Sequence, residues 1–164
     1  MIENKWFCEP NPFREKYCFF YLRTTLDGDQ QLINGWKTGI GNIDSIIHRN
    51  QFSNVDENQI INSLLPEVKV WRKKNVIVIT DTEEKIPILR TRIAALGIDE
   101  INLSATRMIS LESLFNKYFS CSGDANLQSW CILLNINMQE SDEPDMIRII
   151  LQKLIRLIPD EEIP

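Results

Sequence analysis

The sequence predicts a single α/β domain in which helices flank a mixed central sheet. Strand-like stretches dominate the first third of the chain, a short apolar run and an amphipathic helix occupy the middle, and the last third is helical by its apolar spacing. At 164 residues, the chain has the length of one domain that buries about two thirds of its unfolded surface. We place this domain at residues 17–158, between an N-terminal extension at 1–16 and a C-terminal tail at 159–164.

Three antiparallel strands are expected to open the domain. Tyr17–Thr25 is rich in aromatic and β-branched residues, and Asp27-Gly28 marks the tip of a hairpin that leads into Gln31–Thr38. A third apolar stretch, Ile43–His48, follows directly. These stretches predict one antiparallel half of the sheet.

A helix and a buried strand are predicted next. Asn54 or Asp56 is expected to cap the helix, and Pro66 is expected to kink or break it, because an interior proline costs about 3 kcal/mol. Val76–Ile79 is a continuous apolar run, typical of a strand buried on both faces, and we expect it at the centre of the sheet.

The remaining elements are mostly helical. Ile86–Leu96 predicts an amphipathic helix that ends at Gly97, and a fifth strand within Asn102–Ser110 is expected to lie parallel to the fourth. Three further helices are predicted at Leu111–Phe119, at Leu127–Leu134 and from Pro144 to about residue 158. The wide apolar face of the last helix has two interpretations, a deeply packed element or a face shared with a partner chain.

Composition limits the functional classes. The apolar share of 43% and the charged share of 25% are ordinary for a soluble globular protein. A net charge of −5 weighs against a broad nucleic-acid surface, although it is compatible with a local basic groove. No apolar run reaches the length of a transmembrane helix, so we expect no membrane partner and a cytoplasmic location.

Cysteine and histidine positions do not predict a metal site. No two cysteines form a C-x-x-C pair, and the single histidine, His48, has no partner at ligand spacing. Reduced, buried thiols are therefore the expectation for Cys8, Cys18, Cys121 and Cys131. The sequence also lacks the phosphate-loop, zincin and α/β-hydrolase motifs.

Two segments carry a resemblance to a known family. NVIVITDTEEKIPILRTRIAALGID, residues 75–99, has an apolar strand, a short loop, Pro87 and a helix that ends in glycine. YCFFYLRTT, residues 17–25, has the form of a buried strand that ends in threonine. From Tyr17 to about Leu157, the chain resembles the DEDD-type 3′–5′ exonuclease domains, which are ribonuclease H-like and include the proofreading domain of family B DNA polymerases.

The resemblance implies a ribonuclease H-like fold from which the catalytic carboxylates are missing. In the first motif, Asp-x-Glu-Thr, the two metal-binding positions fall on Tyr21 and Arg23, and in the second motif the metal-binding Asp falls on Lys85. None of these side chains ligates magnesium. The resemblance therefore implies a pseudoenzyme of DNA metabolism without catalytic residues, and we expect no cofactor.

Binding is the function that remains for such a domain. Arg90, Arg92 and Arg107 flank the presumed site and are the candidate contacts for single-stranded nucleic acid. A protein partner, or a second copy of the chain, is a further candidate through the 144–158 helix. Arg23 is expected to pair with Asp81 or Glu84, which would preserve the strand geometry after the loss of catalysis.

Two alternatives stay open at this point. The first is an active 3′–5′ exonuclease with Mg or Mn on a rearranged carboxylate site, whose weak candidate ligands are Asp81, Glu83, Glu84 and Asp145. The simpler interpretation of the first three is a solvated loop before a helix, and Asp145 is more simply a first-turn acid favoured by the helix dipole. The second alternative is a structural domain for homo-oligomerisation.

Overall fold

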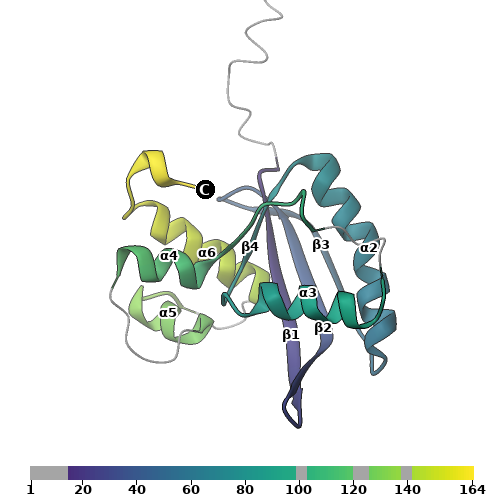
Figure 1. Cartoon of the computed structure of the whole chain (residues 1–164). Helices are drawn as coiled ribbons and strands as arrows, with labels where there is room; N and C mark the ends of the chain where they lie inside the picture. Colours follow the sequence, from purple (N-terminus) through teal and green to yellow (C-terminus); the bar gives the residue numbers. More distant parts are fainter. Residues whose placement is uncertain (1–14, 99–102, 120–125, 138–141) are drawn as a thin grey trace, which may run out of the picture.

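The computed structural model describes residues 15–98, 103–119, 126–137 and 142–164 (Figure 1). Its centre is a five-stranded mixed sheet in the order β3-β2-β1-β4-β5. The strands are β1 (Tyr17–Asp27), β2 (Gln30–Gly41), β3 (Ile46–Ser53), β4 (Ile77–Thr80) and β5 (Met108–Ser110). The helices are α2 (Glu57–Lys74), α3 (Lys85–Ala95), α4 (Leu111–Tyr118), α5 (Leu127–Leu133) and α6 (Glu143–Ile155), followed by a 3-10 turn, η1 (Asp160–Glu162).

The sheet combines both pairing modes. β1 and β2 form an antiparallel hairpin, and β3 adds to β2 in the antiparallel sense. β4 runs parallel to β1, and β5 runs parallel to β4. Gly28, with φ of 60°, provides the left-handed turn between β1 and β2. The predicted α/β class and the mixed sheet flanked by helices are confirmed.

Alternation along β1 builds a core on each face of the sheet. Cys18, Phe20 and Leu22 face the core formed with α2 and α3, whereas Tyr17 and Phe19 face the core formed with α4, α5 and α6. Figure 1 shows the two helical layers on either side of the sheet. Both faces of β1 are therefore covered along its first half.

Three expectations need correction. β3 begins at Ile46, later than predicted, because the Asn42 side chain accepts hydrogen bonds from the backbone N–H groups of Asp44 and Ser45 and folds residues 42–45 into a turn. α2 continues through Pro66 without a break. The proline ring is exposed, so the backbone carbonyl that it leaves unbonded can be solvated. β1, and not β4, is the middle strand.

The helix ends follow the sequence signals. Asp56 caps α2 by accepting a hydrogen bond from the Asn58 N–H, and Gly97, with φ of 66°, follows α3. The segment after α6 packs back onto the domain, since the Tyr17 hydroxyl donates a buried hydrogen bond of 2.8 Å to the Pro164 carbonyl.

Two of the four cysteines lie in the described part. Cys18 and Cys131 are buried, free thiols, as predicted, and burial raises the pKa of both. Cys8 and Cys121 lie outside the described residues. In the same part of the chain, no helix combines the length and hydropathy needed to cross a membrane.

Candidate functional site

A polar hollow of about 460 Å³ opens on the sheet beyond the start of α6. Its floor is formed by two cross-strand rows on β1, β2 and β3. Tyr21, Lys37 and Gln51 form one row, and Arg23, Gly35 and Ser53 form the next. Because directly paired residues share a face, these side chains point away from the α2 and α3 core. Glu143 of α6 forms one wall. We call this region the Gly35 hollow.

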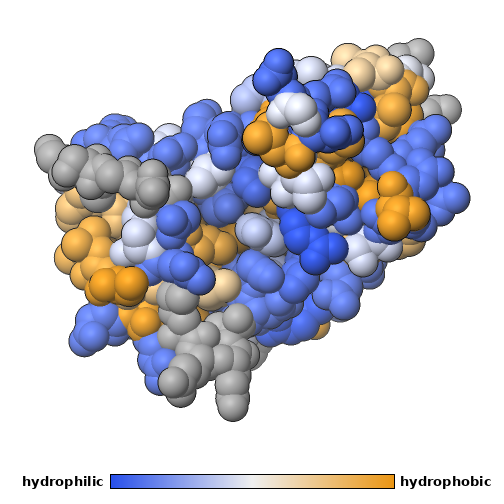
Figure 2. All heavy atoms as spheres, turned by 90° about the horizontal axis from the view of Figure 1, so that it is seen from below, coloured by the Kyte–Doolittle hydropathy of each residue, from blue (hydrophilic) through white to orange (hydrophobic). Residues whose placement is uncertain are grey.

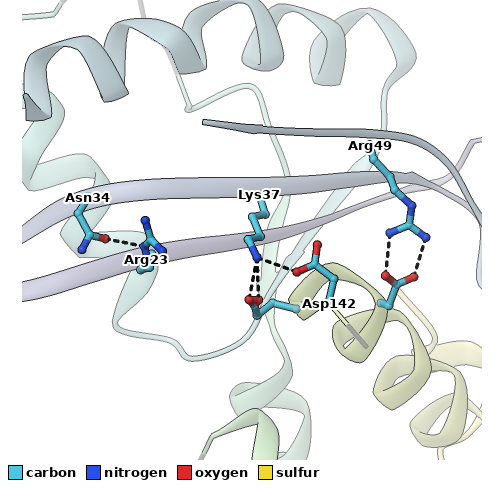
Figure 3. Close-up of polar contacts among 7 residues, drawn as sticks. Arg23, Asn34, Lys37, Arg49 and Asp142 are labelled. Atoms are coloured by element: carbon cyan, nitrogen blue, oxygen red, sulfur yellow. Dashed lines mark hydrogen bonds and ion pairs between the residues drawn. The ribbon is translucent and has the colours of Figure 1, made fainter. Parts of the chain in front are cut away.

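Gly35 and a β-bulge determine the position of Arg23. The register shifts between Arg23 and Thr24, which pair with Gly35 and Ile33, so Asn34 is the extra residue on β2. The Arg23 Nε donates a hydrogen bond of 3.1 Å to the Asn34 Oδ1 (Figure 3). A Cβ on Gly35 would lie 3.3 Å from an Arg23 terminal nitrogen and 3.1 Å from the Phe52 carbonyl oxygen. The missing side chain therefore leaves room for the guanidinium.

Ion pairs fasten the start of α6 to β2 and β3. The Lys37 Nζ lies 2.7 Å from the Asp142 Oδ1 and 3.0 Å from a Glu143 carboxylate oxygen. Arg49 forms a two-pronged pair with Asp145, at 2.7 and 2.8 Å (Figure 3). The candidate acids at the start of this helix are thus paired with side-chain cations.

The electrostatics of these pairs follow from their contacts. The hydrogen bond that the Lys37 ammonium donates to Asp142 raises the pKa of Lys37. Burial raises the pKa of Asp142, but the hydrogen bond and charge of Lys37 outweigh it, and the net shift is downward. Both shifts favour the charged forms at neutral pH.

Two of the three positions that the resemblance assigns to metal ligands, Tyr21 and Lys85, are in contact. The Lys85 Nζ lies 5.0 Å from the centroid of the Tyr21 ring and donates a hydrogen bond to the carbonyl of Leu22, the residue before Arg23. Lys85 reaches this place because α3 starts where β4 ends, and β4 lies beside β1. A cation of the second segment therefore lies against the first segment.

The Tyr21 phenol belongs to the same neighbourhood. Burial raises its pKa, and the negative charges of Asp81 and Glu143 raise it further, against the opposing charges of Arg23 and Lys37. The carboxyl end of β4, the start of α6 and the middle of β1 are thus electrostatically coupled at one place.

The acidic candidates do not form a metal site. Asp81 is buried, unlike the solvated loop residue expected, and its Oδ1 accepts a hydrogen bond of 3.2 Å from the Thr80 hydroxyl. Glu83 accepts a hydrogen bond from the Ser110 hydroxyl, and Glu84 is exposed at the N-cap of α3 without a side-chain capping bond. In the part of the chain that the structure describes, no three His, Cys, Asp or Glu side chains are grouped to hold a metal ion.

Two divalent ions also do not fit the positions that the resemblance assigns. Arg23 and Lys85 would place permanent cations beside the ions, and Tyr21 presents a neutral phenol. Among the described residues, Arg23 forms no ion pair with Asp81 or Glu84, contrary to expectation. Its Nε instead donates a hydrogen bond to the Asn34 Oδ1. We therefore derive no reaction step through a metal ion.

The arginines proposed as nucleic-acid contacts separate into two groups. Arg92 is 9% exposed and lies in an ion pair of 2.5 Å with Glu57, which removes it from the candidate contact surface. Arg90 and Arg107 are exposed, on α3 and immediately before β5 respectively. Arg92 thus helps to hold α3 against the start of α2.

Sequence reasoning did not identify several residues of the Gly35 hollow. Lys37 had no distinguishing signal, because its partner Asp142 comes from the start of a helix about a hundred residues later. Asn34, beside the hollow, had none either, because its contact with Arg23 depends on the strand register. Gly35 did have a signal, since a glycine inside a strand indicates a bulge or a close approach. No family model matches this chain, and no curated protein matches it at a significant level.

Proposed function

We propose that this chain is a ribonuclease H-like domain of the DEDD exonuclease type that no longer performs two-metal chemistry and instead binds single-stranded nucleic acid. The observation that carries the proposal is the contact of Lys85 with the Tyr21 ring and the Leu22 carbonyl. It joins the two segments in which the resemblance locates the metal ligands. A side-chain cation takes the place where the family holds divalent ions.

The arrangement of the sheet supports the proposed fold. Three antiparallel strands open the domain, and β4 and β5 run parallel to β1. α3 follows β4 and precedes β5, as a crossover helix does between parallel strands. This is the order of elements that the resemblance implies.

An active nuclease is less well supported. Two-metal cleavage needs several carboxylate oxygens that converge on ions about 4 Å apart. Asp81 has the Thr80 hydroxyl, Glu83 has the Ser110 hydroxyl and Asp145 has Arg49 as its partner. A metal ion would have to displace these partners and also approach Lys85.

Assembly through α6 is also less well supported. The apolar residues Ile147, Ile150, Leu151 and Leu154 are each 0% exposed, so the face of the helix is already used by the core. Seen from the side of the β1–β2 turn, the surface is mainly hydrophilic, and its apolar patches are separate (Figure 2). No large apolar face of α6 remains for a second copy.

Fluorescence anisotropy with labelled single strands of DNA and RNA, and with a duplex, tests the proposal. We expect single strands to bind, with an affinity that falls as salt rises because phosphate contacts release counterions. Arg90→Gln with Arg107→Gln should weaken binding. Arg72→Gln with Arg156→Gln, at exposed positions at the ends of α2 and α6, removes the same charge and is the matched control.

Nuclease assays complete the test. The purified domain should release no nucleotides in Mg²⁺ or Mn²⁺. Divalent-dependent cleavage that Asp81→Ala abolishes would overturn the proposal in favour of an active exonuclease. No binding to any strand would direct the search to a protein partner.

A further inference from the structure

Arg23 is the cation of the Gly35 hollow that has no carboxylate partner among the described residues. Its Nε donates a hydrogen bond to an uncharged amide oxygen on Asn34, which restricts the guanidinium and leaves the terminal nitrogens free of ion pairs in that part of the chain. An exposed arginine that serves only solubility needs no such anchor. Restricting the guanidinium before a ligand binds reduces the conformational entropy that is lost on binding.

The floor of the hollow is shaped to bring an anion close to this guanidinium. Gly35 lies opposite Arg23 and Ser53 in the sheet, and it has no side chain to cover the backbone between them. The Ser53 hydroxyl and the Gln51 amide are the neighbouring uncharged donors. Five N–H donors in a planar fork suit the oxygens of a phosphate.

The other cation of the hollow is already neutralised. Lys37 is held by the carboxylates of Asp142 and Glu143, so this group of three carries one net negative charge. An anion would therefore bind toward Arg23 and Ser53, away from the start of α6. The electrostatics of the hollow assign one end to an anion.

We propose that the Gly35 hollow binds the terminal phosphate of a phosphate monoester, with Arg23 as the residue that binds the phosphate. The volume of about 460 Å³ falls within the range of small-molecule sites and leaves room for a nucleoside beyond the phosphate. The ligand is either a free mononucleotide or the phosphorylated end of a single strand. The second source rests on the nucleic-acid binding proposed above, whereas the first does not.

Calorimetric titrations of the full chain separate these sources. The probes are inorganic phosphate, a nucleoside monophosphate, its nucleoside, and one single-stranded oligonucleotide with and without a terminal phosphate. We expect the monophosphate to bind and the nucleoside not to bind. Arg23→Gln should weaken binding of the monophosphate at least about tenfold, because hydrogen bonds to charged groups are lost.

Two further variants make the test specific to the proposed geometry. Asp142→Asn removes one negative charge beside the hollow and frees part of Lys37, so it should strengthen phosphate binding about two- to fivefold. If Asp142 had only a structural role, its replacement would not strengthen phosphate binding. Arg72→Gln, at an exposed position in the last turn of α2, has the same charge change as Arg23→Gln and should leave the affinity for phosphate unchanged.

The outcomes are distinguishable. Equal affinity of wild type and Arg23→Gln for the monophosphate, with circular dichroism showing both folded, would overturn the proposed phosphate site. If oligonucleotides bind regardless of their terminal phosphate and of Arg23, nucleic-acid binding stands and the phosphate site fails. If only the mononucleotide binds, and Arg23→Gln weakens it, the phosphate site stands and nucleic-acid binding fails.

Discussion

Two arginine–carboxylate pairs in this protein have similar geometry and very different surroundings. The Arg92–Glu57 pair has side chains that are 10% and 13% exposed, and Glu57 also accepts a hydrogen bond of 2.7 Å from the backbone N–H of Ile33. The Arg49–Asp145 pair is also two-pronged, but the Arg49 side chain is 54% exposed. Burial, and not the number of contacts, decides the energetic effect of losing one partner.

Glu57→Ala should therefore destabilise the protein by about 3 kcal/mol, because it leaves the Arg92 guanidinium buried without a counter-charge. Asp145→Ala, the matched exposed case, should cost about 0.2–1 kcal/mol. Urea denaturation followed by circular dichroism measures both values. Similar losses for the two variants would contradict the assignment of Arg92 to the interior.

Tyr21 should titrate as a perturbed phenol. Because burial and the charges of Asp81 and Glu143 raise its pKa, its phenolate should form at a higher pH than that of an unperturbed tyrosine, about pH 10. The difference between the ultraviolet titrations of wild type and Tyr21→Phe isolates this group. Asp81→Asn should lower the midpoint, since it removes a negative charge, and an unchanged midpoint would show that the two groups are not coupled.

At the scale of elements, α2 contains an internal proline that the rest of the helix tolerates. Asp56 caps its start, Arg72, Lys73 and Lys74 lie in its last turn, and its apolar face packs in the core beside β1 and β2. Burial of the apolar side chains outweighs the missing N–H at Pro66. For this reason the helix continues where its sequence predicts an interruption.

Pro66→Ala should stabilise the protein by about 1–2 kcal/mol, because a backbone hydrogen bond is regained at an exposed position and the gain exceeds the added entropy of the unfolded chain. Pro87→Ala is the control. Pro87 lies in the first turn of α3, where the N–H has no helical partner, so its replacement should not stabilise. Thermal unfolding of wild type and the two variants provides the measurement. A melting temperature of Pro66→Ala below that of wild type would contradict the prediction.

The elements of this chain could be predicted well, and their exact extents less well. Gly28, Asp56 and Gly97 gave local signals for a turn, a cap and a helix end, and each has that role. The start of β3 could not be predicted, because it depends on a side-chain hydrogen bond of Asn42 in the turn. Local chemistry determines where an element starts, while the apolar pattern only shows that it exists.

At the scale of the whole molecule, the candidate site is assembled from distant parts of the chain. Lys37 and Asp142, for example, are joined by a hydrogen bond although they are 105 residues apart in the sequence. The resemblance pointed to Tyr21, Arg23 and Lys85, and the structure brings Lys85 onto the Tyr21 ring. The hollow beside them required the strand register, which no local pattern in the sequence determines.

Restoring the missing carboxylates tests the proposed ancestry of the site. A triple variant, Tyr21→Asp, Arg23→Glu and Lys85→Asp, should bind Mn²⁺ with micromolar affinity, because three carboxylates would converge where Lys85 now contacts β1. Lys85→Asp alone, which supplies only one of them, should not. Calorimetric titration provides the measurement, and a folded triple variant without Mn²⁺ binding would count against the exonuclease resemblance.

Asn34 is an extra residue in the β1–β2 hairpin, and the bulge shows what it contributes. Thr24 pairs with Ile33 and Arg23 pairs with Gly35, so Asn34 has no partner on β1. If Asn34 were deleted, the pairing of the residues on both sides of it would be unchanged. Trp36 would still lie opposite Leu22 in the core. The pairing of β1 with β2 therefore does not require Asn34, whose side chain accepts a hydrogen bond from Arg23. A deletion variant that keeps its thermal stability but loses phosphate affinity would identify Asn34 as a residue retained for binding alone.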